Sequence, residues 1–472
     1  MRNTEDDEVT EQLPAWPSPH LAVSILHGSL HLSLFVGRLF LTIALQYLYL
    51  TSVRTKDAET VKSLGYIAIV YLTLGLCLSS CIYAQNTGFP DIEIVESTPV
   101  GTMLDNPDIR NTHEVWLEMI GRAERTLDIE QFYISNEPGK LLEDVLAAIY
   151  GAAGRDVKVR VIVDARMYKT YPASVDSLGG YPNIETRRID FGAIAGGIQH
   201  AKYFIVDGKE VFVGSQNFDW RALEHIHELG LRINNKEIAA IYADVFNVDW
   251  QFSSASAKNI DPASFTRVYQ TPIRLSTGMG DDADVVPTFS PIGFIPDSTL
   301  WEERAIVNVI NGAQQSLALQ FLSYSTLNRK NGSYTAIDDA IRNAAKRGVK
   351  IRMIVSDWEK GSSAVRTLKD LSSIPNVEVA FTSIPEWSGG YIPFARVEHC
   401  KYVVADKMRF WLGSSNCEKS YYYSTRNVGV VCNSASLAGT LARIFLKSWE
   451  SPYKELITVD GEYRPREHGE RR

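Results

Sequence analysis

The sequence has few cysteines and no excess of positive charge, and each shortage excludes a class of protein. Its 472 residues include five cysteines, with no Cys-x-x-Cys pair and no Cys/His ligand spacing, so a structural zinc site is not expected. The formal net charge is −8, so no basic field over the whole protein attracts nucleic acid or anionic lipid. A site for a phosphate group must therefore be local.

Three of the cysteines, Cys400, Cys417 and Cys432, follow the N-terminal segment. Cys417 and Cys432 flank a predicted strand turn and could form a disulfide in an oxidising compartment. Three buried, unpaired thiols fit the sequence equally well.

The first 87 residues are predicted to lie outside the main fold. Residues 23–53 are apolar but interrupted, and residues 64–84 carry no charge and are long enough to span a bilayer. One interpretation is a hairpin of two membrane helices, whose basic loop lies in the cytoplasm by the positive-inside rule. The alternative is a secretory signal over residues 61–84, in which LSSC at 78–81 resembles the lipid-attachment box of bacterial lipoproteins.

Both interpretations place residues 88–472 outside the cytoplasm, in a membrane-anchored protein or a lipoprotein. The catalytic domain would then be periplasmic, extracellular or lumenal. A cytoplasmic catalytic domain is the remaining alternative.

The rest of the chain repeats itself once. HAKYFIVD at 200–207 recurs as HCKYVVAD at 399–406, and GSQN at 214–217 recurs as GSSN at 413–416, both with the same offset of 199 positions. Chance does not place matched motifs in one register. In each half, apolar runs alternate with amphipathic helical stretches, which predicts two similar α/β sandwich halves packed about a pseudo-twofold axis.

The predicted boundaries follow from this repeat and from composition. The first half covers residues 88–255 and the second covers 301–458. Residues 256–300 are interpreted as a connector, and 459–472 as a polar tail that frays.

Two pairs of cationic side chains carry the predicted chemistry. His200 and Lys202 stand two positions apart on an apolar strand, so both point to the same face, and His399 and Lys401 repeat the arrangement. Burying such groups is unfavourable unless an opposite charge pairs with them, and a phosphate would do so. If the halves pack about a twofold axis, the two histidines meet across one phosphate. One imidazole must then be neutral to attack phosphorus while the other is protonated to donate to the leaving oxygen.

Further polar residues of the repeat are predicted to lie close to these pairs. Asp207 and Asp406 follow the histidines by seven positions and are candidate catalytic residues, with turn capping and ion pairing as the structural alternative. The neutral groups predicted to donate to phosphoryl oxygens are Ser215, Asn217, Ser414 and Asn416.

These motifs resemble the HKD signature of the phospholipase D superfamily, His-x-Lys-x4-Asp followed by Gly-Ser-x-Asn, over residues 90–458. The resemblance implies that His200 is the nucleophile, forming a phosphohistidine, and that His399 acts first as general acid and then as base. It implies that the motif lysines and asparagines hold the phosphoryl oxygens, and that no metal or other cofactor is required.

The resemblance also implies a supporting role for Glu228. In the family an acidic residue at this place, after the first Gly-Ser-x-Asn, orients the histidine of the opposite half. The second half offers Asn427 in register, with Arg426 beside it, so unequal roles are expected for the two halves. His225 and His227 are predicted to be incidental.

A narrower resemblance rests on three segments. FDWRALEHIHELGL, YIPFARVEHCKYVVAD and FLKSWESPY are similar to the animal lysosomal exonucleases of this superfamily. That resemblance implies trimming of single-stranded DNA or RNA from the 5′ end by a membrane-anchored enzyme. Bases would stack on aromatic rings. The candidates are Trp220, Trp387, Tyr391, Tyr421, Tyr422 and Tyr423.

Two other functions stay open. The first is lipid chemistry, as in phospholipase D or in cardiolipin synthases, which share the motif pair and begin with two hydrophobic segments. Such an enzyme needs an apolar stretch near the pocket that faces the membrane, and residues 284–295 are the candidate. The second is an inactive binding or scaffold protein, which the two intact motifs disfavour.

Overall fold

The computed structural model describes residues 90–470 except 255–259, 266, 268 and 329–331. Residues Pro90–Arg472 form one compact unit. The predicted membrane or signal segments at 23–53 and 64–84 lie outside the described residues. In the part of the chain that the structure describes, no helix combines the length and the apolar character needed to cross a bilayer.

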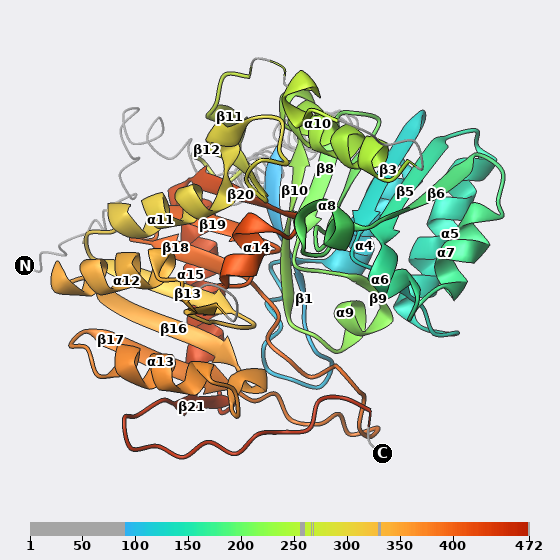
Figure 1. Ribbon diagram of the computed structural model, residues 1–472. Coiled ribbons are helices and arrows are strands. Elements are labelled where there is room, and N and C mark those ends of the chain that lie inside the picture. Colours follow the sequence, from blue (N-terminus) through green and yellow to red (C-terminus); the bar gives the residue numbers. More distant parts are fainter. Residues whose placement is uncertain (1–89, 255–259, 266, 268, 329–331, 471–472) are drawn as a thin grey trace, which may run out of the picture. The chain divides into compact units, whose positions relative to one another are not determined.

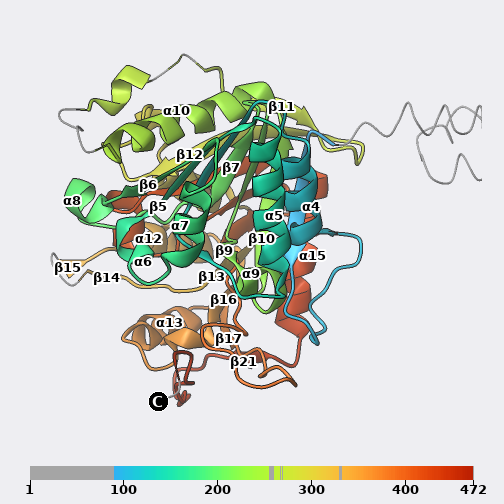
Figure 2. The same ribbon diagram turned by 90° about the vertical axis from the view of Figure 1, so that its right-hand side faces the viewer.

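The first half is built on an eight-stranded mixed sheet, in the order β2-β1-β10-β8-β7-β3-β5-β6. β3, β5 and β6 run parallel, whereas β7, β8 and β10 are antiparallel neighbours. Helices α4 and α5 pack side by side on one face (Figure 2). The strands are β1 (Ile92–Ser97), β2 (Arg110–Asn111), β3 (Thr126–Gln131), β5 (Lys158–Asp164), β6 (Ile184–Ile189), β7 (Tyr203–Val206), β8 (Glu210–Gly214) and β10 (Glu228–Asn234), and the longer helices are α4 (Thr112–Gly121), α5 (Leu141–Gly154), α7 (Ala173–Gly179) and α10 (Lys236–Phe252).

The second half repeats this arrangement in a nine-stranded sheet, in the order β11-β12-β20-β19-β18-β13-β16-β17-β21. Figure 1 shows the two sheets in blue to green and in yellow to red. The strands are β11 (Ile273–Ser276), β12 (Asp282–Ser290), β13 (Ser316–Phe321), β16 (Lys350–Ser356), β17 (Val377–Thr382), β18 (Tyr402–Ala405), β19 (Arg409–Gly413), β20 (Asn427–Asn433) and β21 (Lys454–Leu456), and the longer helices are α11 (Glu302–Gly312), α12 (Ala336–Lys346), α13 (Ala364–Ser372) and α15 (Ala435–Glu450).

Short elements complete both halves, several of them next to the repeated motifs. They are α6 (Ala165–Tyr168), α8 (Phe191–Ala195), α9 (Trp220–Glu224), α14 (Lys419–Tyr423), the paired strands β4 (Ile134–Ser135) and β9 (Phe218–Asp219), the hairpin of β14 (Leu327–Asn328) and β15 (Gly332–Ser333), and the 3-10 turns η1 (Pro262–Phe265), η2 (Ser298–Leu300) and η3 (Asp357–Glu359).

Hydrophobic periodicity accounts for the helices and for the cores beneath them. In α12, Ile337, Ile341 and Ala344 recur at helical spacing and are buried together. Each half has its own core of this kind, and a third core forms where the halves meet. That third core joins Tyr203 and Tyr242 of the first half to Tyr402 of the second. The halves therefore share buried apolar surface, which fixes their motifs relative to each other.

The predicted connector is partly a structured piece of the second half. β12 pairs with β20 from Asp284↔Asn433 to Ser290↔Asn427, and β11 pairs with β12. β1 stands beside β10 in the same way in the first half. Much of β12 is buried, so its apolar side chains fill the sheet, and residues 284–295 do not form a stretch that faces outward. Composition alone did not reveal this strand because β20, the partner that joins it to the rest of the sheet, lies more than 130 residues away.

The predicted fraying tail is docked against the second half. Arg466 Nη1 donates to Asp357 Oδ2 at 3.0 Å, and the Tyr391 hydroxyl donates to Gly469 O at 2.6 Å. These partners come from segments distant in sequence, so local polarity gave no sign of them.

Candidate active site

The two histidine motifs lie at the junction of the halves, each paired with backbone of the other half. His200 N donates to Arg426 O at 2.9 Å, and His399 N donates to His227 O at 2.9 Å. His200 and His399 are both buried residues, and Lys202 and Lys401 are fully buried. The fold thus brings together the four groups that the sequence assigned to one site.

Each imidazole is oriented by a residue of the opposite half. His399 Nδ1 lies 2.8 Å from both carboxylate oxygens of Glu228, and His200 Nδ1 lies 3.0 Å from Asn427 Oδ1. These are the two positions that the register of the repeat matched. Because both Nδ1 atoms are engaged, Nε2 is the atom that each histidine can present to a substrate.

The hydrogen bonds around Asn427 fix the tautomer of His200. Asn427 Nδ2 donates to Tyr421 O and Thr425 O, and Ser414 Oγ donates to Asn427 Oδ1. The amide oxygen therefore faces His200, whose Nδ1 carries the proton. Neutral His200 then has a lone pair on Nε2, as a nucleophile requires.

Burial and mutual repulsion keep these groups from being charged together. The pKa of His200 is held well below its ordinary value by burial and by Lys202 and Lys401. The pKa of His399 is likewise lowered by burial, by both lysines and by His200. Burial lowers the pKa of Lys401 to about 7. A phosphate anion among these four groups would offset the repulsion and favour their charged forms.

The Glu228–His399 pair holds one proton more than the Asn427–His200 pair near neutral pH. Burial raises the pKa of Glu228 to about 8, against the opposing effect of Lys401. Whether the extra proton sits on the carboxyl or on the imidazole, His399 Nε2 carries a hydrogen. The geometry therefore supplies an acid on one side of the junction and a base on the other.

The serines of Gly-Ser-x-Asn act as braces between strands. Ser215 Oγ donates to Leu229 O at 3.2 Å and accepts from Leu229 N. Ser414 Oγ accepts from Val428 N and shares its one proton between Asn427 Oδ1 and Val428 O. Their hydroxyl protons are therefore engaged within the protein, and their role as phosphate donors stays a prediction. Asn217 and Asn416 stay predicted phosphate ligands, with side chains buried beside the motif.

Asp207 and Asp406 tie each motif strand to the neighbouring strand. Asp207 accepts hydrogen bonds from the backbone N–H groups of residues 124–126, and Asp406 from those of residues 314–316. Both adopt a left-handed turn conformation, with φ of 53° and 54°. These contacts support the structural alternative over the predicted catalytic role.

Sequence reasoning missed a buried ionic cluster next to the site. His227 Nδ1 lies 2.5 Å from Glu398 Oε2, and its Nε2 lies 2.9 Å from Glu96 Oε1. Burial acts to lower the pKa of His227, but Glu398 and Glu96 outweigh it and raise this pKa to about 10. The sequence predicted His227 to be incidental, and these contacts give it a structural role beside the motif. His227, Glu398 and Cys400 bring three possible metal-ligand atoms close together. Both ring nitrogens of His227, however, already face carboxylates.

Arg426 is the second-half counterpart of His227. Its guanidinium forms two hydrogen bonds with Asp249, at 2.6 and 2.8 Å, and the pair is fully buried. A signal was present in the sequence: His227 and Arg426 match at the offset of 199 positions, and each precedes the residue that supports a histidine.

The predicted stacking aromatics separate into different environments. Tyr421 faces the site, with its ring 5.2 Å from that of His200. Tyr422 is fully buried and Tyr423 is exposed. Trp220 and Trp387 flank His225, and Lys140 lies over both indole rings.

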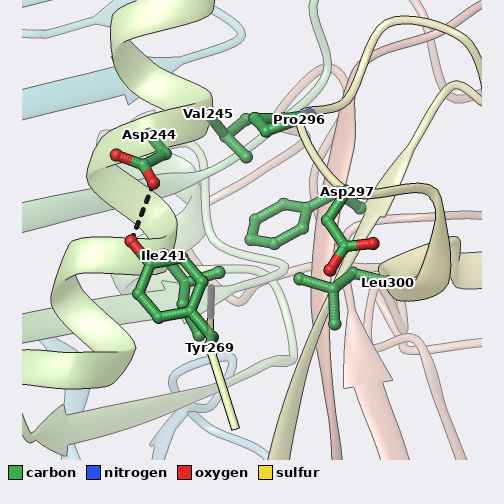
Figure 3. A pocket seen from close by; sticks show the side chains of 8 residues that line it. Ile241, Asp244, Val245, Tyr269, Pro296, Asp297 and Leu300 are labelled. Carbon is green, nitrogen blue, oxygen red and sulfur yellow. Dashed lines mark hydrogen bonds between the residues drawn. The ribbon is translucent and has the colours of Figure 1, made fainter. Parts of the chain in front are cut away.

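Cys400, Cys417 and Cys432 are buried free thiols, which agrees with the alternative of three unpaired thiols rather than with a Cys417–Cys432 disulfide. A small hollow beside α10 (Figure 3) is lined by residues outside the repeated motifs, and the Tyr269 hydroxyl donates to Asp244 Oδ2 there at 2.7 Å.

A family model described as cardiolipin synthase, PLD-like domain, matches residues 116–250 and 306–449. The chain belongs to the phospholipase D superfamily. Each matched segment contains one HKD motif with its Gly-Ser-x-Asn, so the superfamily's repeat accounts for the two halves described above.

Curated relatives cover most of this phospholipase D-like chain. Phospholipase D Z of Dictyostelium discoideum is 27% identical over 393 residues, covering 78% of this chain and 91% of the relative. The 5'-3' exonuclease PLD3 of Homo sapiens is 28% identical over 392 residues, covering 76% and 79%. The crystal structure of phosphatidylserine synthase from Haemophilus influenzae shares the fold, with a TM-score of 0.53, 12% identity, and coverage of 73% of this chain and 85% of that one.

Proposed function

We propose that the protein is a phosphodiesterase that works through a phosphohistidine on His200, and that it trims single-stranded nucleic acid from the 5′ end. One observation carries the mechanism: the two histidines have unequal partners, Asn427 for His200 and Glu228 for His399. An amide stabilises a neutral imidazole, whereas a carboxylate stabilises a protonated one.

The reaction follows from these assignments. His200 Nε2 attacks phosphorus and forms a P–N bond, while the P–O bond to the leaving group breaks and the leaving oxygen takes a proton from His399 Nε2. Water then gives a proton to His399, and its oxygen attacks phosphorus and breaks the P–N bond. Lys202 and Lys401 offset the charge that develops on the phosphoryl oxygens. With these four side chains in those roles, we expect activity to persist in the presence of a chelator.

Support for nucleic acid comes from relatives and from the surroundings of His200. Several relatives are named 5'-3' exonuclease PLD3. The Phe132 and Tyr421 rings lie 4.9 and 5.2 Å from the His200 ring, so aromatic surface borders the reacting group.

Phosphatidyl transfer or phospholipid hydrolysis is the second candidate function. The family model's description and the name of the Dictyostelium relative favour it. The stretch proposed to face a membrane, residues 284–295, is instead mostly a strand within the second sheet, which weakens this candidate.

The location of the enzyme is a further part of the proposal. The uncharged run at 64–84 and the basic loop before it support an anchor or export signal that places the catalytic halves outside the cytoplasm. A protease should then degrade an extracellular catalytic domain on intact cells, and should spare a lumenal one in sealed vesicles until detergent opens them.

The test of function uses the purified full-length chain in detergent, with His200→Ala as control, and runs each reaction with and without a chelator. One reaction contains 5′-hydroxyl single-stranded DNA and the other contains phosphatidylglycerol vesicles. Stepwise loss of nucleotides from the 5′ end, absent in the variant, is the expected result. Head-group release with intact DNA would replace the exonuclease proposal with the lipid one, and loss of activity on chelation would contradict the metal-free mechanism.

A further inference from the structure

A continuous row of aromatic rings leads from His200 to the rim of the first half. The Phe132 ring lies 4.9 Å from the His200 ring and 5.4 Å from the Tyr133 ring. Tyr133 in turn stacks on Tyr171, with centroids 4.9 Å apart and planes inclined by 25°. Phe132, Tyr133 and Tyr171 are each only partly buried, so the row keeps ring surface accessible to solvent.

The row is held in place by polar contacts at its edge. The Tyr133 hydroxyl donates to Asp219 Oδ2 at 2.8 Å, and Arg221 fixes the same carboxylate with a contact of 2.6 Å. Lys202 Nζ lies 5.1 Å from the Phe132 ring centroid. A platform whose rings are already ordered loses little conformational entropy when a ligand stacks on it.

Positive charge accompanies the row, although the whole chain is acidic. Arg166 lies in α6, Lys169 follows it, and both side chains are exposed. Arg188 is half exposed and lies 3.4 Å from Asp176 Oδ1, and its guanidinium carbon lies 3.5 Å from the ring centroid of Tyr168. Rings beside cationic groups suit a polyanion that carries flat bases.

The second half has no such row at the matching positions, as far as the structure describes it. Leu322 and Ser323 follow β13 where Phe132 and Tyr133 follow β3, and Ser323 Oγ donates to Glu418. After β16 the counterpart of α6 is acidic, and its Asp357 is paired with Arg466 of the docked tail. A ring row needed only to hold the repeated fold together would be expected in both halves.

We propose that Phe132, Tyr133 and Tyr171 form a stacking platform for the bases of single-stranded nucleic acid, so that the strand runs from the catalytic histidines across the first half. This inference rests on the proposed nuclease function and adds a route for the strand. The relevant ligand surface is the π-face of a base, so the platform accepts any base.

The test combines a ring deletion with deletion of single bases. Tyr171→Leu in the full-length chain removes the outer ring but keeps apolar bulk, and Tyr181→Leu, an exposed tyrosine of the same half, is the matched control. Substrates are 5′-hydroxyl DNA 12-mers, either complete or abasic at one of the first four positions. For the complete 12-mer, we expect Tyr171→Leu to raise KM about tenfold with little change in kcat, because one base stack is lost. Tyr171→Trp should retain the wild-type KM.

At one abasic position the wild-type KM should rise by a similar factor, and Tyr171→Leu should add nothing further there. An equal KM increase for Tyr171→Leu on every substrate, including all the abasic ones, would show a general structural defect and overturn the platform. If wild type digests DNA and Tyr171→Leu has the same KM as wild type, the platform is overturned and the nuclease proposal is left intact. Failure of the wild-type enzyme to digest DNA, with phosphatidylglycerol cleaved, would overturn both.

Discussion

The two halves share one backbone arrangement but surround their histidines with different groups. In the first half, His200 meets the amide of Asn427, and in the second, His399 meets the carboxylate of Glu228. The difference shows that a duplicated fold can make one copy of a histidine a nucleophile and the other a general acid. The orienting residue of each histidine comes from the other half, so neither half contains a complete site.

The same exchange of an amide for a carboxylate recurs among the residues that pack behind the two motif strands. In the first half, Gln199 Nε2 and the Tyr203 hydroxyl both donate to the carboxylate of Glu130. In the second half, the Tyr402 hydroxyl donates to Gln320, whose amide donates to Glu398. The hydrogen-bond pattern is retained while amide and carboxylate exchange places.

Removing either histidine should have the largest effect on kcat and should separate the roles of the two halves. Both His200→Ala and His399→Ala should lower kcat by about 10⁴- to 10⁶-fold on natural substrates. On a 4-nitrophenyl phosphodiester the leaving group needs no proton, so His399→Ala should still release one nitrophenolate per site, and His200→Ala none. Rapid-mixing absorbance measures this burst, and a burst from His200→Ala alone would reverse the assigned roles.

Changing the orienting residues should have the next largest effect. We expect Glu228→Gln to lower kcat by about 10²- to 10⁴-fold, because His399 loses the carboxylate that supports its acid form. Asn427→Ala should cost only about tenfold, since a neutral hydrogen bond is lost.

The pH dependence follows from the same pair. The pKa of Glu228 is raised to about 8, so the extra proton leaves the Glu228–His399 pair as pH rises through this value, and kcat/KM should fall there. The pKa of His200 lies well below 6.5, so the acidic limb should fall below that pH. A profile of kcat/KM against pH checks both limbs, and a Glu228→Gln enzyme with an unshifted alkaline limb would contradict the assignment.

The buried cations should matter for stability in both halves. Glu398→Gln leaves His227 with one carboxylate, and we expect the free energy of unfolding to fall by about 3 kcal/mol, measured in urea. Asp249→Asn should act similarly on Arg426. Because folding raises the pKa of His227 from 6.5 to about 10, its stabilisation is complete below pH 6.5 and is lost as pH rises through 10. Equal stability of Glu398→Gln and wild type at pH 7 would exclude this role.

The smallest effect on stability and activity is expected for the two motif aspartates, which make the same contacts in both halves. Asp207→Asn and Asp406→Asn should each lower the free energy of unfolding by about 1 kcal/mol and leave kcat unchanged, because each carboxylate caps three backbone N–H groups. Their pKa values are lowered, so this stabilisation is present above pH 3.8 and is lost as pH falls through the lowered value. A large loss of kcat in the folded variants would restore the catalytic interpretation.

Features that depend on neighbouring residues could be predicted from the sequence, and features that depend on contacts between distant segments could not. The alternation of His200 and Lys202 within one strand, and the same offset in the second motif, were enough to predict a shared site. The docked tail was missed since its partners are distant segments, and β12 was missed since the partner that joins it to the sheet, β20, is distant too. His227 was missed because its two carboxylates, Glu96 and Glu398, lie 131 and 171 positions away.

The sequence by itself determined the repeat, the residues on each motif strand and the face that they share, because side-chain direction along a strand is a local property of the backbone. Only the tertiary structure decided that Asn427 meets His200 across 227 positions and Glu228 meets His399 across 171. Those contacts form when the apolar surfaces of the halves are buried against each other. That packing brings the fixed charges close enough to shift the proton affinities of two identical imidazoles.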